Sequence, residues 1–408
     1  MTEKERVFAY LDGSSKSIVG LESLLTSIPA LAPESEGVGE LAKAEALMTW
    51  LDANGIHDLR RLDAPDPRVP SGIRPNIIAT IPGKSDEGRL WVMTHLDVVP
   101  EGDRSMWLSD PYAVVEKDGK VYGRGVEDNQ QGLVASVFCA LAFVKNGLVP
   151  GRTIKLLFVA DEECGSKYGI QYLLKEHDLF RKDDLIIIPD GGLPDGSMIE
   201  VAEKNICWLK VMTKGKQTHG STPDSGANAF LAACDLALRI HELERTVFTA
   251  RDPLFDPDRT TLSPTKKEAN VPNVNTIPGD DVFYVDMRIL PQYPVVMVLR
   301  ETERLLGEVG AKYGVTMSQE IVQSNQSLAT APDAPVVKVL ADAVKSVYGV
   351  KAKPQGIGGG TVGAYLRTAG YDCVVWAKMD ETAHQPNEYS VIANIIGDAK
   401  VFATLALF

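Results

Sequence analysis

Three apolar segments of the chain each end in side chains that can bind metal ions. Residues 90–94 lead into His95-Leu96-Asp97, residues 154–160 lead into Asp161-Glu162-Glu163, and residues 185–189 lead into Asp190. Each segment has the length and composition of a buried strand. Ligands of open α/β sheets bind at the carboxyl ends of strands, so three such ends that carry imidazole and carboxylate predict one shared metal site.

Composition limits the class of protein. The chain has 408 residues, of which 44% are hydrophobic and 24% charged, so we expect a soluble globular protein with two domains. The longest apolar stretch has about half the length of a membrane-spanning helix, and residues 1–6 lack a signal-peptide core, so we expect a cytoplasmic protein without a membrane partner. A net charge of -13 argues against nucleic acid as a partner. The five cysteines form neither a close pair nor a Cys-x-x-Cys motif, which favours no disulfide framework and no thiolate zinc site.

Strand-like and helix-like segments alternate in the first half of the chain. Strands are predicted at 76–81, 90–94, 154–160 and 185–188, and helices at 20–51 (broken at 29–33), 132–145 and 167–179. This order is typical of a sheet between layers of helices. The pattern resumes with helices at 334–348, 361–369 and 390–408 and a strand at 372–377.

The segment between these two parts has a different pattern. It predicts strands at 205–213, 281–289 and 316–323, separated by helices at 228–243 and 296–310. We therefore expect an α/β fold whose first domain, residues 1–203 and 325–408, has a mixed, mostly parallel sheet between helices. A smaller α+β domain with an antiparallel sheet, residues 204–324, is expected as an insertion.

Five motifs in a fixed order resemble those of a known enzyme family. They are Met93-Thr94-His95-Leu96-Asp97-Val98-Val99-Pro100, Gly123-Arg124-Gly125-Val126-Glu127-Asp128, Asp161-Glu162-Glu163, Pro189-Asp190 and Ala383-His384-Gln385-Pro386-Asn387-Glu388. The chain resembles the M20 family of zinc metallopeptidases and amidohydrolases over nearly its whole length. That family includes dipeptidases, aminoacylases and the ArgE/DapE deacylases. The resemblance implies that the first domain is the metal-binding catalytic domain and that the insertion is a lid and dimerisation domain.

The resemblance also implies a ligand set for two divalent metal ions. Asp128 would bridge the ions, His95 and Asp190 would hold one of them, and Glu163 and His384 would hold the other. Zinc is the expected metal, and Co²⁺ and Mn²⁺ accept the same nitrogen and oxygen donors.

Three further residues receive catalytic roles from the resemblance. Asp97 would orient the His95 imidazole, with a surface helix cap as the alternative interpretation. Glu162 would be the general base, and His219, in the segment Gly215–Pro223 of the sequence, would stabilise the oxyanion, commonly in the partner subunit's site. A solvated acid and an ordinary loop histidine are the respective alternatives.

Substrate contacts are expected from two regions. Asn275 and Arg288 resemble lid residues that bind substrate, and a guanidinium suits a substrate carboxylate, although an ion pair of Arg288 with Asp286 is an equally good interpretation. Gly359, Gly360 and Thr361 open a predicted helix whose backbone amides could hold a carboxylate. Val362 stands where many deacylases of the family carry aspartate, which argues against a strict desuccinylase or acetylornithine deacylase, and Asp190, where many acylases have glutamate, resembles the dipeptidase-like branch.

We therefore expect a homodimeric metallohydrolase that cleaves the amide bond of a small dipeptide or N-acyl amino acid with a free carboxylate. One alternative is a deacylase that acts on N-acetyl, N-succinyl or N-carbamoyl amino acids. A catalytically silent binding protein on the same fold is the remote alternative.

Overall fold

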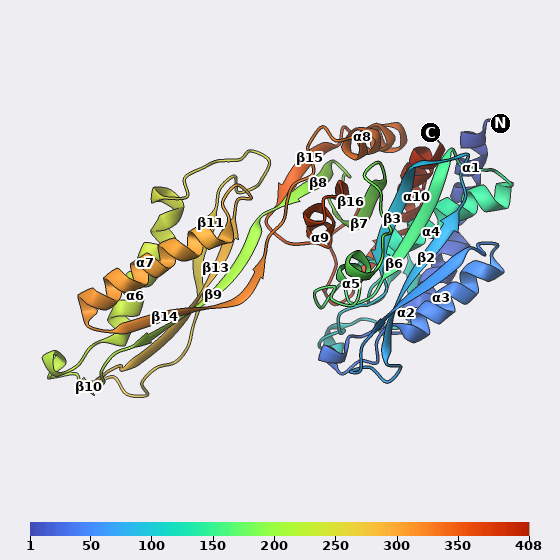
Figure 1. The fold of residues 1–408 in the computed structure, drawn as a ribbon. Coiled ribbons are helices and arrows are strands. Elements are labelled where there is room, and N and C mark those ends of the chain that lie inside the picture. The colour runs from blue at the N-terminus through green and yellow to red at the C-terminus, as the bar shows by residue number, and fades with distance from the viewer. Residues whose placement is uncertain (408) are drawn as a thin grey trace. The chain divides into compact units, whose positions relative to one another are not determined.

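The computed structural model describes residues 1–407, which divide into two compact units (Figure 1). The first unit comprises residues 1–201, 330–354 and the chain from Tyr365 onward, and the second comprises residues 202–329 and 355–364. The expected fold class is confirmed, because one unit contains a large mixed sheet and the other an antiparallel sheet with helices. Among residues 1–407, none of the helices combines the length and apolar character that crossing a bilayer requires.

The large sheet has eight strands and a parallel centre. Its order is β1 (Leu59–Pro65), β2 (Ile73–Ile81), β6 (Arg152–Val159), β3 (Ser85–His95), β7 (Leu185–Gly192), β16 (Cys373–Ala377), β8 (Met198–Glu203) and β15 (Lys353–Ile357). The pairs β6–β3, β3–β7 and β7–β16 are parallel, whereas β1, β2 and β8 pair in antiparallel fashion. The parallel centre is what brings several carboxyl strand ends to one edge.

Helices bury the central strands. Helix α4 (Gln130–Asn146) is buried along its first 14 residues and packs on β3, β6 and β7, and α10 (Ile392–Leu407) packs against α4. A helix that is apolar all round belongs in a protein interior. The other helices of this unit are α1 (Glu3–Asp12), α2 (Ser15–Thr26), α3 (Leu41–Ala53), α5 (Ile170–Glu176), α8 (Pro335–Tyr348) and, from Tyr365 onward, α9 (Gly363–Thr368). Helix α5 is shorter than the predicted helix at 167–179, because Gly169 packs directly against the Ala160 carbonyl and residues 166–169 form a turn.

A small second sheet of the same unit contains two strands that are close in sequence to candidate site residues. Its order is β17 (Tyr389–Val391), β5 (Lys120–Tyr122) and β4 (Val115–Lys117), and Tyr389 pairs with Tyr122 in antiparallel register. Asp128 follows β5 in the chain and His384 precedes β17. The pairing therefore places the segments that carry these two residues side by side.

The second unit is an antiparallel sheet with two helices on one face. The strand order is β11 (Thr261–Lys267), β13 (Asp280–Ile289), β9 (Asn205–Lys214) and β14 (Thr316–Asn325), and α6 (Ala229–Thr246) and α7 (Val295–Tyr313) lie over it (Figure 1). Alternate residues of β9 and β13 form the core with both helices. A two-stranded ribbon of β10 (Thr218–His219) and β12 (Thr276–Ile277) carries the candidate His219.

A buried carboxyl on α10 makes the stability of the first unit depend on pH. Asp398 is fully buried, and its Oδ1 lies 2.8 Å from the Tyr348 hydroxyl oxygen. Burial raises the pKa of Asp398 from its ordinary value of 3.8 to about 7. Since the folded protein holds this proton more tightly than the unfolded chain, the stability that it confers is complete below about pH 4 and is lost as the pH rises through about 7.

We expect Asp398→Asn to remove this pH dependence. The asparagine amide can donate to the Tyr348 hydroxyl, which in turn donates to the Asn394 carbonyl 3.2 Å away. The difference in melting temperature, variant minus wild type, should therefore be more positive at pH 8 than at pH 5 in circular dichroism melts. An equal difference at both pH values would contradict this account, and the exposed Asp178→Asn is the matched control.

Candidate metal centre

The carboxyl ends of three neighbouring parallel strands meet at the candidate site. His95 is the last residue of β3, Glu162 and Glu163 follow β6, and Asp190 lies near the end of β7. Asp161 turns the chain after β6 with a left-handed φ of 63°. The structure therefore brings together the three strand ends that the sequence indicated.

Asp128 lies between the two histidines. Its Oδ1 is 2.9 Å from the His95 Nε2, and its Oδ2 is 3.0 Å from the His384 Nε2. Each imidazole also faces a second carboxylate, because Asp190 Oδ1 lies 3.5 Å from the His95 Nε2 and Glu163 Oε2 lies 3.2 Å from the His384 Nε2. The five side chains thus form two adjacent groups that share Asp128.

His95 is oriented through its other ring nitrogen. Its Nδ1 lies 3.0 Å from the backbone carbonyl oxygen of Asp97 and 3.5 Å from the Asp97 Oδ1. Both neighbours are hydrogen-bond acceptors, so Nδ1 carries a proton and the other ring nitrogen, Nε2, is directed at Asp128 and Asp190. This orientation leaves Nε2 as the atom that would bind a metal ion once it has lost its own proton.

The side chains of Asp97 and Glu40 bind the backbone of the turn that carries the two adjacent glutamates. Asp97 accepts hydrogen bonds from the backbone N–H groups of Glu162 (3.1 Å) and Glu163 (3.0 Å), and Glu40 accepts one from the Asp161 N–H (3.2 Å). Arg74, which is fully buried, pairs with Glu40. Asp97 therefore supports both His95 and the Glu162–Glu163 turn.

The electrostatics of the cluster show an excess of buried carboxylate. Burial raises the pKa of Glu162 well above its usual range, and the nearby charge of Asp190 adds to this effect. Burial likewise raises the pKa of Glu163 to about 7. Burial alone would also raise the pKa of Asp128, but hydrogen bonds from His384 and His95 hold it far below its ordinary value. A divalent cation would supply the positive charge that such a cluster lacks.

The cluster contains two overlapping groups of donor atoms that could each hold a metal ion. The donor atoms of His95, Asp128 and Glu163 lie within 4.8 Å of one another, as do those of His95, Glu162 and Asp190. Imidazole nitrogen and carboxylate oxygen are the ligands that zinc and related divalent metals bind.

One supporting residue of the site was not anticipated from the sequence. Asn129 donates from its Nδ2 to the Asp190 Oδ1 at 2.6 Å and to the Pro189 carbonyl at 2.8 Å. It therefore positions Asp190 from the segment that also carries Asp128. Its only sequence signal was its position directly after Asp128, because Asn129 lies outside the motifs.

The remaining predicted residues belong to the second unit. His219 is exposed, its Nδ1 contacts the Ser221 hydroxyl at 2.7 Å, and its Nε2 lies 3.5 Å from the Asn275 Nδ2. Arg288 donates from Nε and Nη2 to both oxygens of Asp286 and from Nη1 to the Gly358 carbonyl. The structure thus forms the ion pair that was one of the two interpretations of Arg288.

The Gly358–Thr361 segment of the sequence precedes α9. The Thr361 hydroxyl donates to the Glu203 Oε1 at 2.6 Å and accepts from the Gly363 N–H at 3.1 Å. A Cβ on Gly360 would lie 3.3 Å from Ile206, so Gly360 approaches β9 closely. Helix α9 begins two residues later than the predicted helix, because Thr361 forms a turn with its own hydroxyl.

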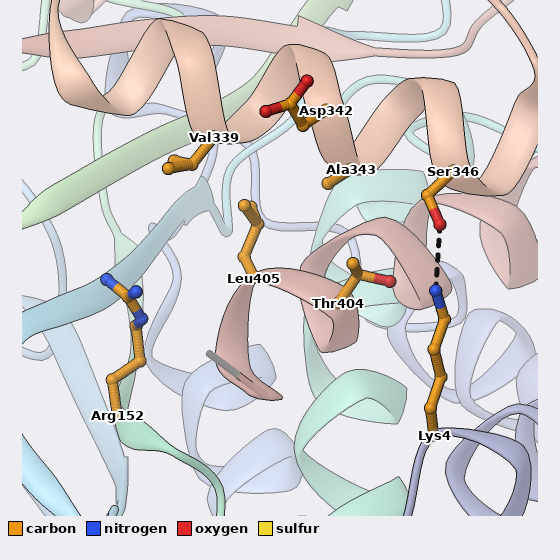
Figure 2. A pocket seen from close by; sticks show the side chains of 8 residues that line it. All are labelled: Lys4, Arg152, Val339, Asp342, Ala343, Ser346, Thr404 and Leu405. Atoms are coloured by element: carbon orange, nitrogen blue, oxygen red, sulfur yellow. Dashed lines mark hydrogen bonds between the residues drawn. The ribbon is translucent and has the colours of Figure 1, made fainter.

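A separate pocket of about 340 Å³ lies in the first unit (Figure 2). It is lined by side chains from α8 and α10 together with Lys4 and Arg152, and Lys4 donates to the Ser346 hydroxyl across it. None of the candidate metal ligands lines it.

Fold and donor set together are those of an α/β metallohydrolase. The model of the peptidase family M20/M25/M40 matches residues 91–407, so the chain belongs to this family. An uncharacterized metallohydrolase from Methanococcus maripaludis is 38% identical over an alignment of 404 positions that covers 94% of this chain and 97% of that protein. The succinyl-diaminopimelate desuccinylase of Wolinella succinogenes is 29% identical, covering 74% of this chain and 79% of the relative. The aminopeptidase PepT of Bacillus cereus shares the fold with a TM-score of 0.77 and 16% identity, covering 96% of this chain and 98% of the other.

Proposed function

We propose that the protein hydrolyses the amide bond of a small dipeptide or N-acyl amino acid that bears a free carboxylate. The observation that carries this proposal is the position of Asp128 between two imidazoles, each of which faces a second carboxylate. His95, Asp190 and Asp128 would hold one zinc ion, and Glu163, His384 and Asp128 the other. When bound, the ions act as Lewis acids that acidify water and polarise the scissile carbonyl.

Glu162 is the residue best placed to move the proton. Among the described residues, no donor hydrogen-bonds to its carboxylate, whereas both oxygens of Glu163 lie within 3.3 Å of the His384 Nε2. The two neighbours therefore differ, since Glu163 is directed at an imidazole and Glu162 is left to accept a proton from water. Glu162 then passes this proton to the leaving amine.

His219 has the hydrogen-bonding state that an oxyanion donor requires. The backbone N–H of Ser221 donates to its Nδ1 at 3.2 Å, so in the neutral ring the proton resides on Nε2. That Nε2–H is exposed and able to donate to a developing oxyanion. We assign His219 to the active site of the partner subunit, which is the role that the resemblance to this family implies.

The substrate carboxylate and amide would contact the second unit. Arg288 keeps one N–H on each terminal nitrogen after its bonds to Asp286 and Gly358, and a planar guanidinium binds carboxylate in a directed way. Asn275 lies beside His219 and would contact the substrate amide. Backbone groups of Gly359 and Gly360 and the side chain of Thr361 complete the proposed contacts.

A substrate panel on protein of known metal content tests the proposal. Dipeptides, N-acetyl, N-succinyl and N-carbamoyl amino acids are incubated with protein loaded with Zn²⁺, Co²⁺ or Mn²⁺, and the products are separated by chromatography. We expect dipeptides to give the highest kcat/KM. A preference for succinyl or acetyl substrates would instead assign the deacylase activity that the name of the Wolinella succinogenes relative suggests. Failure of every amide to react at full metal occupancy would contradict the hydrolase proposal.

We also propose that the protein is a homodimer that associates through α6. Phe230, Leu231 and Leu238 are 42%, 52% and 68% exposed on this helix, and Cys234 lies between them at helical spacing. Such an apolar stripe on a helix surface is typical of an interface. Leu238→Glu should convert the dimer to a monomer in light scattering, whereas Glu242→Gln, at an exposed polar residue of the same helix, should not. A monomeric wild type at micromolar concentration would contradict this assembly.

A further inference from the structure

Two segments that carry metal-ligand candidates are joined by buried carboxylates, because each segment has a glutamate that hydrogen-bonds to the backbone of the other. Asp128 follows β5, His384 precedes β17, and β5 and β17 are paired strands. Each of these segments also contributes one buried glutamate, Glu127 from the first and Glu388 from the second, and both are 1% exposed. Neither glutamate is among the proposed metal ligands.

Glu388 binds the backbone of the segment that ends in Asp128. Its Oε2 accepts hydrogen bonds from the Arg124 Nη1 (2.6 Å) and the Gly125 N–H (3.0 Å). Its Oε1 accepts from the N–H groups of Glu127 (2.9 Å) and Asp128 (3.1 Å). One carboxylate therefore satisfies three backbone donors in the four residues 125–128 and fixes the backbone of Asp128 itself.

Glu127 binds the backbone of the segment that leads to His384. Its Oε1 accepts from the Asp380 N–H at 2.8 Å, and its Oε2 accepts from the N–H and, at 2.8 Å, the hydroxyl of Thr382. This segment is conformationally demanding, because Glu381 and His384 both have left-handed φ values, 59° and 62°. Non-glycine residues in that region are unfavourable unless the surroundings hold them, and Glu127 supplies that restraint.

We propose that Glu127 and Glu388 form a reciprocal clamp that sets the position of Asp128 relative to His384, and that both are positioning residues of the metal centre. This inference rests on the metal pair proposed above. The clamp fixes the 3.0 Å approach of the Asp128 Oδ2 to the His384 Nε2 through charge-assisted hydrogen bonds between buried groups. The clamp positions Asp128 and His384 by binding the backbone of their segments, whereas Asp97 positions His95 by contacting its imidazole ring.

The two glutamates have different expected effects on the two ions. Glu127 holds only the His384 segment, so Glu127→Gln should weaken the ion held by Glu163 and His384 and spare the other. Glu388 holds the backbone of Asp128, whose two oxygens face both histidines, so Glu388→Gln should weaken both ions. Loss of a group that orients a ligand lowers metal affinity about 10–100-fold.

The test uses Co²⁺ titrations of the metal-free full-length protein, followed by absorption spectroscopy. We expect wild type to bind two ions, Glu127→Gln to show one weakened step with an altered spectrum, and Glu388→Gln to show two. Asp184→Asn is the matched control, because it breaks a buried carboxylate pair with Arg89 in the same unit. It should lower the melting temperature without changing either binding step. Wild-type affinities and spectra in both glutamine variants would overturn the clamp.

Hydrogen exchange of the metal-free protein tests the clamp without any metal. Glu127→Gln should speed exchange mainly in residues 380–388, and Glu388→Gln should do so mainly in residues 123–128. Unchanged exchange in the segment that each glutamate binds would overturn the clamp. Thr382→Val removes the hydroxyl that contacts Glu127 and the backbone of Tyr389 but keeps the Thr382 N–H bond to Glu127, and it serves if a glutamine variant fails to fold. Wild-type protein that binds fewer than two ions would contradict the proposed metal pair, and the exchange experiment would still decide the clamp.

Discussion

Asp128→Asn is expected to reduce bound metal from two ions to at most one per chain and to lower turnover by about 10³-fold or more. Both oxygens of Asp128 face imidazoles, at 2.9 Å and 3.0 Å, so an amide nitrogen must replace the oxygen at one of the two groups. An amide nitrogen does not bind a divalent ion. Each bound ion contributes several kcal/mol of transition-state stabilisation, and every 1.4 kcal/mol is a tenfold change in rate.

Metal content and steady-state rates on the same preparation check this prediction. Inductively coupled plasma mass spectrometry gives the ions per chain, and the panel substrate with the highest kcat/KM gives the rate. Asp178→Asn, an exposed substitution of the same kind, should leave both unchanged. Two tightly bound ions with an unchanged rate in Asp128→Asn would show that Asp128 is not the shared ligand.

The strand ends of the site could be predicted from sequence because they carry two coincident signals. The apolar runs before His95, Asp161 and Asp190 have the length of buried strands, and the residues that follow are of the types that bind metal. Parallel pairing of β6, β3 and β7 then places all three ends at one edge. The apolar pattern of each strand and the metal-binding type of the residues after it indicated the same α/β fold class.

The supporting contacts could not be predicted, because they join residues far apart in the chain. Glu127 and Thr382 are separated by 255 positions, and Arg124 and Glu388 by 264. An acidic residue buried by such a contact has the same sequence signature as an exposed one. Glu127 and Glu388 stood inside recognised motifs, yet nothing in the motif showed that each binds the other segment's backbone.

Short strands with polar or glycine residues also gave no sequence signal. Strand β15, Lys353–Ile357, contains Pro354 and Gly356, and β1 exposes two successive arginines. Strand β15 lacks the alternation of a half-buried strand, and in β1 the alternation is confined to residues 61–65, so tertiary pairing rather than local preference determines these strands. As a result, the return of residues 355–364 to the second unit is visible only in the structure.

Glu162→Gln is expected to retain both metal ions and to lower kcat by about 10²–10⁴-fold, the range that a general base contributes. Its carboxylate lies in the same cluster as His95 and Asp190, while its backbone N–H is held by Asp97 at 3.1 Å. Glutamine has the same shape and keeps that backbone bond. It cannot take a proton from water, so the loss should fall on kcat with little change in KM.

Glu163→Gln is the informative comparison, because the two glutamates are neighbours in one turn. The Glu163 carboxylate contacts the His384 Nε2 at 3.2 Å, so its replacement should remove one ion as well as the activity. Metal analysis therefore separates the two roles where rates alone would not. Loss of metal from Glu162→Gln, or wild-type kcat in that variant, would contradict the assignment of Glu162 as the base. Retention of both ions in Glu163→Gln would contradict its assignment as a ligand.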